Sequence, residues 1–122
     1  MKEDNKKSGS EGEDIAAGLL EKKGYHIVKR NFRFGKGEID IIARKDGLLI
    51  FIEVKTRKNL EFGEPEYAVT KSKQKQIIRI ARAYLYENNI TEVQCRFDVV
   101  AILFDNHGIP AINHIENAFI DM

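Results

Sequence analysis

Acidic side chains and a lysine occur in two adjacent apolar segments of the chain, 38–44 and 48–57. Both segments are rich in Ile, Val or Phe, which predicts β-strands. The dipeptide Asp-Gly at 46–47 separates them and is the strongest short-range signal for a β-hairpin. With this dipeptide as the turn, the register places Asp40 directly opposite Glu53. The hairpin is therefore expected to bring two carboxylates together.

The same register places Glu38 opposite Lys55, on the face that carries Asp40 and Glu53. The other face is expected to be apolar and to carry Ile39, Ile41, Ile50, Ile52 and Val54. Two like charges directly opposed on a sheet destabilise it, so another group must offset their repulsion. Lys55 offsets part of it. Mg²⁺ would offset more, because carboxylate oxygens are its preferred protein ligands.

Asp, Glu and Lys in this arrangement suit the hydrolysis of a phosphodiester bond. A bound Mg²⁺ polarises a phosphoryl oxygen and lowers the pKa of a water molecule, and a nearby Lys stabilises charge that develops on the phosphate. A simpler interpretation stays open, in which Glu38 and Lys55 form an ordinary cross-strand salt bridge. The tripeptide E-x-K carries little information by itself, because a second copy occurs at 21–23.

The elements around the hairpin predict an α/β protein with a mixed central sheet flanked by helices, in the order α-β-β-β-α-β. A helix is expected from near Ser10 to Gly24, and the other expected elements are strands 25–34, 38–44 and 48–57, a helix 70–88, a strand 94–104 and a short edge strand 111–115. The strand 94–104 has a nearly continuous apolar centre and should lie inside the sheet. Its Asp98 is interpreted as structural and paired with an arginine. Segment 58–69 is interpreted as a loop, and its residues leave open whether it contacts substrate.

Length and composition narrow the class of protein. The 122 residues fit one domain, expected over 10–122, with a polar and disordered tail over 1–9. The 20 basic and 19 acidic residues exclude a strongly basic, histone-like protein. The single cysteine, Cys95, excludes an internal disulfide framework and suits the cytoplasm. Neither a signal peptide nor an apolar run of about 20 residues is present, so no membrane association is expected.

The segments GEIDIIA (37–43) and FIEVKTR (51–57) resemble the core of the PD-(D/E)xK nucleases, which have the restriction-endonuclease-like fold. A wider pattern is similar to the YraN-like family of small uncharacterised bacterial proteins and covers residues 10–104. It includes Gly12-Glu13, Gly24-Tyr25, Arg-Asn-Phe-Arg at 30–33, Lys73-Gln74 and Arg-Phe-Asp-Val-Val at 96–100. The nearest characterised relatives by motif are archaeal Holliday junction resolvases. One departure is Ile39, which replaces the proline of the namesake motif.

This resemblance implies an endonuclease that depends on Mg²⁺ or Mn²⁺. In the superfamily, the residues that match Asp40 and Glu53 hold the metal, and the one that matches Lys55 acts beside the attacking water. A glutamate on the first helix, which is Glu13 here, is often both a metal ligand and a catalytic residue. A residue on the following helix often supports the site, and Gln74 or its neighbour at 73 matches it.

Glu13 also has an explanation without any site. Together with Ser10 it has the spacing of a capping box at a helix N-terminus, and from the residues alone that interpretation is the simpler one. The resemblance favours the role in the site.

Two basic stretches predict contacts with nucleic acid. Residues 22–36 include six Lys or Arg and no acid, and residues 71–82 include five and no acid. Such stretches attract phosphate, although a solvated surface is the simpler explanation. The candidate nucleic-acid-binding residues are Arg30, Arg33, Lys36, Arg57, Lys71, Lys73 and Lys75.

The expected substrate is DNA, with branched or junction DNA as one candidate. Cleavage of a four-way junction takes two cuts, which favours a homodimer. Two alternatives stay open. One is a non-catalytic nucleic-acid-binding module that retains the fold, and the other is a nuclease that acts on RNA.

Overall fold

The computed structural model describes residues 2–58 and 69–121, with side chains from Ser10 onward. Its elements are α1 (Lys2–Lys22), β1 (His26–Phe34), β2 (Gly37–Lys45), β3 (Leu48–Lys58), α2 (Lys71–Glu87), β4 (Gln94–Phe104) and β5 (Pro110–Phe119). The predicted element order and mixed α/β class are confirmed, and they are consistent with a restriction-endonuclease-like fold. Most of the predicted loop 58–69 lies outside the described residues.

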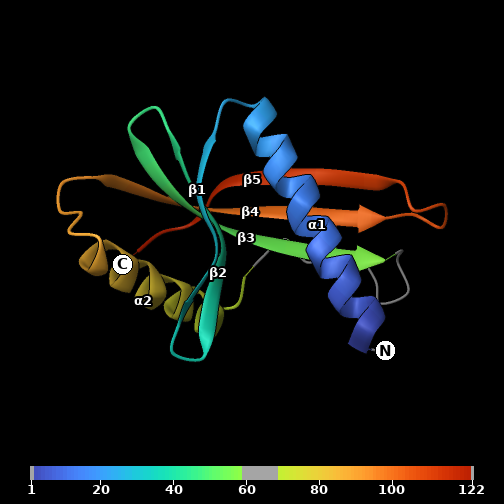
Figure 1. The fold of residues 1–122 in the computed structure, drawn as a ribbon, viewed down its shortest axis with the longest axis horizontal. Helices are drawn as coiled ribbons and strands as arrows, with labels where there is room; N and C mark the ends of the chain where they lie inside the picture. The colour runs from blue at the N-terminus through green and yellow to red at the C-terminus, as the bar shows by residue number, and fades with distance from the viewer. Residues whose placement is uncertain (1, 59–68, 122) are drawn as a thin grey trace.

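The five strands form one mixed sheet in the order β1-β2-β3-β4-β5. β3 and β4 are parallel, as the crossover through α2 requires, and the other neighbours are antiparallel. β4 is internal and β5 is an edge strand, as predicted, but β5 extends to Phe119, beyond the expected end at 115. Figure 1 shows the β1–β2 ribbon turned steeply away from the other three strands.

α1 begins at Lys2 rather than near Ser10, so the predicted helix start was wrong. Lys and Glu are good helix formers, and no proline interrupts the residues before Ser10. The predicted disorder of residues 1–9 in solution remains a prediction. None of the helices in the described residues combines the length and hydropathy that a bilayer span requires.

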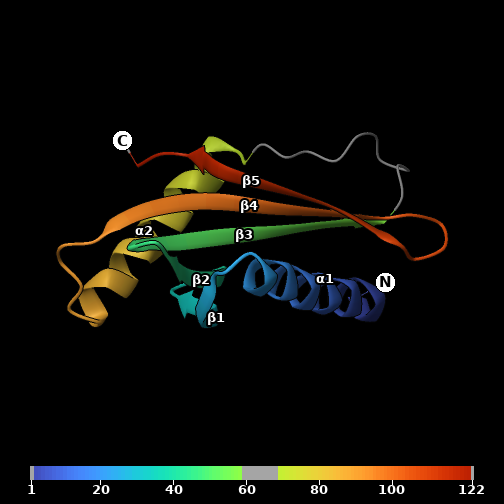
Figure 2. The same cartoon turned by 90° about the horizontal axis from the view of Figure 1, so that it is seen from above.

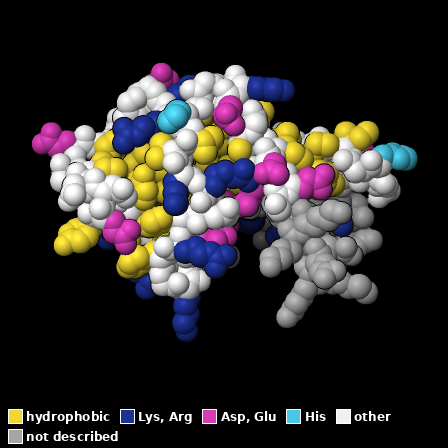
Figure 3. Space-filling view, in the orientation of Figure 1, with side chains coloured by type: hydrophobic (Ala, Val, Ile, Leu, Met, Phe, Trp, Pro, Cys, Tyr) yellow, Lys and Arg dark blue, Asp and Glu magenta, His cyan; other side chains and the backbone are white. Residues whose placement is uncertain are grey.

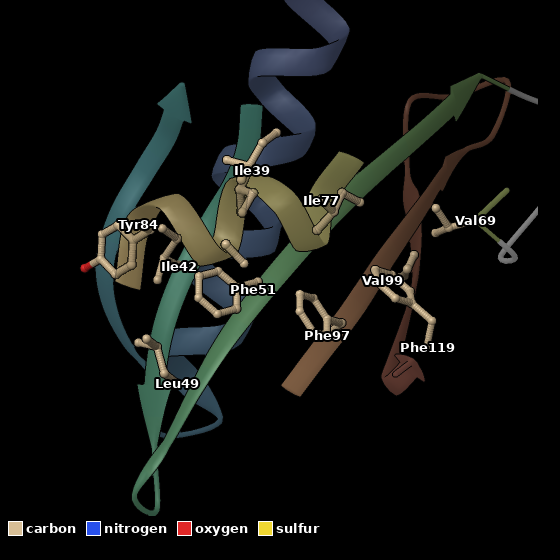
Figure 4. Packing of buried hydrophobic residues seen from close by; sticks show 12 residues of the cluster. Ile39, Ile42, Leu49, Phe51, Val69, Ile77, Tyr84, Phe97, Val99 and Phe119 are labelled. Carbon is tan, nitrogen blue, oxygen red and sulfur yellow. The ribbon is translucent and has the colours of Figure 1, made fainter. Parts of the chain in front are cut away.

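The sheet has a hydrophobic core on each face, with one helix over each (Figure 2). α1 covers a core that includes Leu20, Ile41 and Ile52. α2 covers a second core that includes stacked aromatic rings, and Figure 4 shows Phe51, Phe97 and Phe119 next to one another there. Each face buries apolar surface, which is the main source of stability in such a layered fold.

One residue lies on the face opposite to the one expected. Ile39 belongs to the core under α2, whereas its predicted companion Ile41 lies under α1. Their partners on β1 are Phe32 and Arg30, and Asn31 between these partners has a left-handed backbone (φ 55°). The ribbon therefore bends next to Asp40, and strict alternation of side chains is lost there.

Candidate active site

β2 and β3 separate just before the acidic residues. Their ladder runs from Lys45–Leu48 to Ile41–Ile52, which confirms the predicted register, and it ends there. The direct pairing of Asp40 with Glu53 was therefore wrong. Instead, an Asp40 carboxylate oxygen accepts a hydrogen bond of 2.7 Å from the backbone N–H of Val54. A main-chain donor of β3 thus holds the Asp40 side chain in the space where the strands diverge.

Glu38 has a different partner from the one expected. Its cross-strand neighbour is Arg33 on β1, and the Arg33 Nε lies 3.2 Å from a Glu38 carboxylate oxygen. The predicted position opposite Lys55 was wrong, because the β2–β3 ladder ends before Glu38. One oxygen of Glu38 instead lies within 4.8 Å of oxygens of both Asp40 and Glu13.

Glu13 reaches this point because α1 lies very close to β3. A Cβ atom added to the preceding residue, Gly12, would lie 2.2 Å from the Thr56 hydroxyl oxygen, so no larger residue fits without movement. Burial raises the pKa of the Glu13 carboxyl, and repulsion from Glu38 adds to the rise, while attraction by Arg30 opposes it. Glu13 lies within α1 rather than at its start, so a helix cap does not explain this residue.

The surroundings of the acidic side chains disfavour their negatively charged forms. Burial raises the pKa of Asp40 to about 8, and repulsion from the Glu53 carboxylate adds to the rise. Burial also raises the pKa of Glu53, against the attraction of Lys73 and Lys55. Glu53 is therefore an electrostatic neighbour of Asp40, although its oxygens are not part of the group of three within 4.8 Å. Two lysines face the site from the side of Glu53.

The helix residue that faces the acids is Lys73 and not Gln74. The Gln74 side-chain amide donates a hydrogen bond of 2.8 Å to the backbone carbonyl of Val69, and it thereby closes the first turn of α2. Lys73 attracts Glu53 and also donates its backbone N–H to the capping hydroxyl of Thr70. Both residues were candidates from the sequence. The sequence could not separate them, because adjacent helix positions differ only in the direction in which their side chains point.

The candidate nucleic-acid-binding residues divide into two groups. Arg30 and Arg33 lie beside the acids, with Arg30 paired to Asp14 at 2.8 Å, and Lys36 occupies the turn between β1 and β2. Lys71, Lys73 and Lys75 lie in the first turns of α2, and Arg57 donates to the carbonyl of its neighbour Thr56. Figure 3 shows acidic side chains gathered where α1 crosses the sheet, with Lys and Arg side chains beside them.

The donor set fits a hard divalent cation. Three carboxylates offer oxygens within 4.8 Å of one another, and Mg²⁺, with bonds of about 2.1 Å, joins oxygens up to roughly 4 Å apart. Small side-chain rotations would close that difference. The set contains oxygen ligands alone, which favours Mg²⁺, Mn²⁺ or Ca²⁺ over metals that prefer His or Cys. Sequence reasoning placed Glu38 beside Asp40 but overlooked it as a ligand, although its position two residues before Asp40 was a usable signal.

A second acidic centre lies on β4 and is built differently. Asp98 is fully buried and accepts hydrogen bonds from Arg96 at 2.8 and 2.9 Å and from the backbone N–H of Asn117 at 3.0 Å. The Nε2 of His114 lies 2.8 Å from the same carboxylate, and the Arg96 guanidinium continues to the hydroxyl of Tyr25. The predicted pairing of Asp98 with an arginine is confirmed. This cluster joins the end of α1 to β4 and β5.

Comparison with known proteins agrees with the pattern of motifs. A UPF0102 protein of Pelobacter propionicus is 48% identical over 118 residues, which cover 95% of this chain and 84% of that protein. A UPF0102 protein of Geotalea daltonii is 49% identical over 97% of this chain and 93% of its own length. One of Prosthecochloris aestuarii is 55% identical over 91% of each chain. The pattern of the uncharacterised protein family UPF0102 matches residues 12–102, and the chain belongs to this family, also called the YraN family.

Proposed function

We propose that this protein is a metal-dependent endonuclease that hydrolyses phosphodiester bonds of DNA, including branched or junction DNA. The observation that carries the proposal is the convergence of Glu13, Glu38 and Asp40, with Glu53 as their electrostatic neighbour, at the point where two strands separate. A purely structural site gains nothing from crowded carboxylates, whereas a site for a divalent cation and a phosphate requires them.

Each residue has a proposed role. Glu13, Glu38 and Asp40, whose oxygens lie within 4.8 Å of one another, would hold Mg²⁺ or Mn²⁺, and Glu53, the other ligand expected from the sequence, would act as their electrostatic neighbour. The metal, when bound, would polarise a phosphoryl oxygen and lower the pKa of a water molecule. Lys55, which attracts the Glu53 carboxylate, orients the attacking water and stabilises charge on the phosphate. Lys73 assists from α2. Gln74 acts indirectly, because its bond to Val69 fixes the first turn of that helix.

The proposed substrate contact is electrostatic. The basic side chains at the β1–β2 turn and in the first turns of α2 suit the phosphate backbone, and no motif for reading bases is present in the sequence, so we expect recognition of shape. A substrate that must be cut at two positions favours a homodimer, because a homodimer carries two active sites. We propose the cytoplasm as the compartment, because the single Cys95 suits a reducing environment.

Metal binding and cleavage are to be measured on the same variants. Calorimetric titration with Mn²⁺ should detect binding to the natural chain and its loss in Asp40→Asn, while Asp46→Asn in the exposed hairpin turn should bind normally. Asn tolerates the left-handed backbone at Asp46 (φ 51°), so this control keeps the fold. Lys55→Ala should retain metal binding and lose cleavage of labelled junction, flap and duplex DNA.

The outcomes separate the alternatives. Absence of Mn²⁺ binding to the natural chain would remove the metal site and with it the proposal. Metal binding without cleavage of any substrate would favour a non-catalytic nucleic-acid-binding module. Cleavage of RNA in place of DNA would keep the chemistry and change the substrate.

A further inference from the structure

The turn between β1 and β2 lines a small, open polar pocket beside the acidic group. The pocket has a volume of about 260 Å³ and is lined by Arg33, Gly35, Lys36, Gly37 and Glu38. A water molecule in the liquid occupies roughly 30 Å³, so the pocket has room for several waters or for a phosphate group. Two of its three charged residues are cationic.

One side of the β1–β2 turn packs against α2, and the other side is accessible. Gly35 has a left-handed backbone (φ 62°), and no atom lies within 4 Å of the position that its Cβ would occupy. Gly37 is pressed against α2, since its Cβ would lie 2.5 Å from the Gln76 side chain and 2.8 Å from that of Ile80. The helix therefore fixes one side of the turn, while the absence of a side chain at Gly35 leaves the other side accessible.

Arg33 is one of the residues that line this pocket. Its Nε lies 3.2 Å from a Glu38 carboxylate oxygen, which orients the guanidinium, and its side chain as a whole is 81% exposed. A guanidinium oriented in this way can bind two phosphate oxygens at once. Lys36, also exposed, adds a second positive charge from the turn.

Glu38 belongs to the pocket and to the acidic group at once. A carboxylate oxygen of Glu38 lies within 4.8 Å of oxygens of Glu13 and Asp40, and Glu38 is also one of the residues that line the pocket. A phosphate bound in the turn is therefore the immediate neighbour of any phosphate at the acidic group. Consecutive phosphates of one nucleic-acid strand have this relation.

We infer that the β1–β2 turn is a phosphate subsite, in which Arg33 and Lys36 bind a backbone phosphate of the substrate strand next to the phosphate that is cleaved. The inference deepens the proposed function and rests on it for the identity of the substrate. The subsite itself is a property of the turn and can be tested without cleavage.

The test uses the full chain in EDTA, so that no hydrolysis occurs. Titration with inorganic phosphate, followed by ¹H–¹⁵N NMR, should shift the backbone amides of Gly35, Lys36 and Gly37 in the natural chain. The shifts should disappear in the double variant Arg33→Ala/Lys36→Ala. Shifts confined to other amides, or none, would overturn the subsite.

Binding of labelled DNA in EDTA provides the second measurement. Arg33→Ala should weaken binding about tenfold at low salt and reduce the slope of log K against log[salt] by about 1, as expected for the loss of one phosphate contact. Arg44→Ala removes the same charge from an exposed position on β2 and should change the affinity less than twofold. Equal effects of the two variants would contradict the inference.

The two proposals fail separately. If phosphate shifts the turn amides but no substrate is cut in Mn²⁺, the endonuclease proposal fails and the phosphate subsite stands. If substrates are cut, and Arg33→Ala keeps the natural KM with no shift at the turn, the subsite fails alone.

Discussion

Two carboxyl groups of this protein, one buried and one partly buried, lie on strands and in opposite electrostatic states. Asp98 is fully buried, yet its pKa is lowered, because His114, Arg96 and the Asn117 amide donate to it or attract it more strongly than burial opposes its charge. Asp40 is less buried, yet its pKa rises to about 8, because burial disfavours its charge, neighbouring carboxylates repel it, and a single backbone donor offsets only part of this.

The difference shows how to tell a structural carboxylate from a functional candidate. Burial alone does not distinguish the two, since Asp98 is the more buried. The neighbours do distinguish them. Hydrogen-bond donors and a cation offset the buried charge of Asp98, whereas the neighbours of Asp40 include three other acids, which repel its charge. The predictions below test this distinction, from the largest expected effect to the smallest.

Removal of the Asp98 charge should have the largest effect. Asp98→Asn leaves the guanidinium of Arg96 without its partner, and we expect the free energy of unfolding in urea to fall by about 3–5 kcal/mol. The control is Asp105→Asn in the exposed β4–β5 turn, where an amide oxygen still accepts the turn hydrogen bonds, with an expected loss within about 1 kcal/mol. Equal losses in the two variants would refute the structural role of Asp98.

The close approach of α1 to β3 should produce the next effect. Gly12→Ala places a Cβ 2.2 Å from the Thr56 hydroxyl oxygen, and we expect a loss of about 1–3 kcal/mol in unfolding free energy from overpacking. Thr56→Ala in the same chain should restore part of it. Gly18→Ala on the same helix, with no atom within 4 Å, should instead stabilise by about 1 kcal/mol. Chemical denaturation measures all three, and a stable Gly12→Ala would contradict the packing.

Replacement of Asp40 should change the pH dependence of the unfolding free energy in the direction opposite to replacement of Asp98. The pKa of Asp40 is about 8 in the folded chain against an ordinary value of 3.8, so the folded state binds more protons than the unfolded state between these values. The unfolding free energy should therefore fall as pH rises from 4 to 8.

Asp40→Asn has no such group and should flatten this part of the pH profile, measured by urea unfolding in EDTA. For Asp98 the direction is reversed, since its lowered pKa gives stability that is complete above about pH 4 and lost as pH falls further. If Asp40→Asn and the natural chain lose stability in parallel above pH 4, the contrast between the two carboxyls is wrong.

The smallest effect is expected for His114. His114→Gln removes the imidazole that contacts Asp98 at 2.8 Å but leaves the Arg96 pair, so we expect a loss of about 1 kcal/mol in unfolding free energy. His107→Gln in the exposed turn, where only the backbone N–H of His107 forms a described hydrogen bond, should change nothing measurable. A loss as large as that of Asp98→Asn would mean that His114, rather than Arg96, is the main group that stabilises the Asp98 charge.

Much of this architecture was predictable from local pattern. The apolar segment 94–104 coincides with β4, and the Asp-Gly turn gave the register of β2 and β3 correctly, because turn chemistry and side-chain alternation act over a few residues. The start of α1 was predicted wrongly, because a capping pattern also occurs by chance inside a helix.

The arrangement of the acids was only partly predictable. The sequence by itself determined that Asp40 and Glu53 lie near each other, since a hairpin register follows from its turn. Only the tertiary structure decided that β2 leaves β3 before Asp40, that Glu38 pairs with Arg33, and that α1 brings Glu13 into the group. These contacts depend on how a bent ribbon and a helix pack across the sheet, and such long-range packing leaves no periodic signal in the chain.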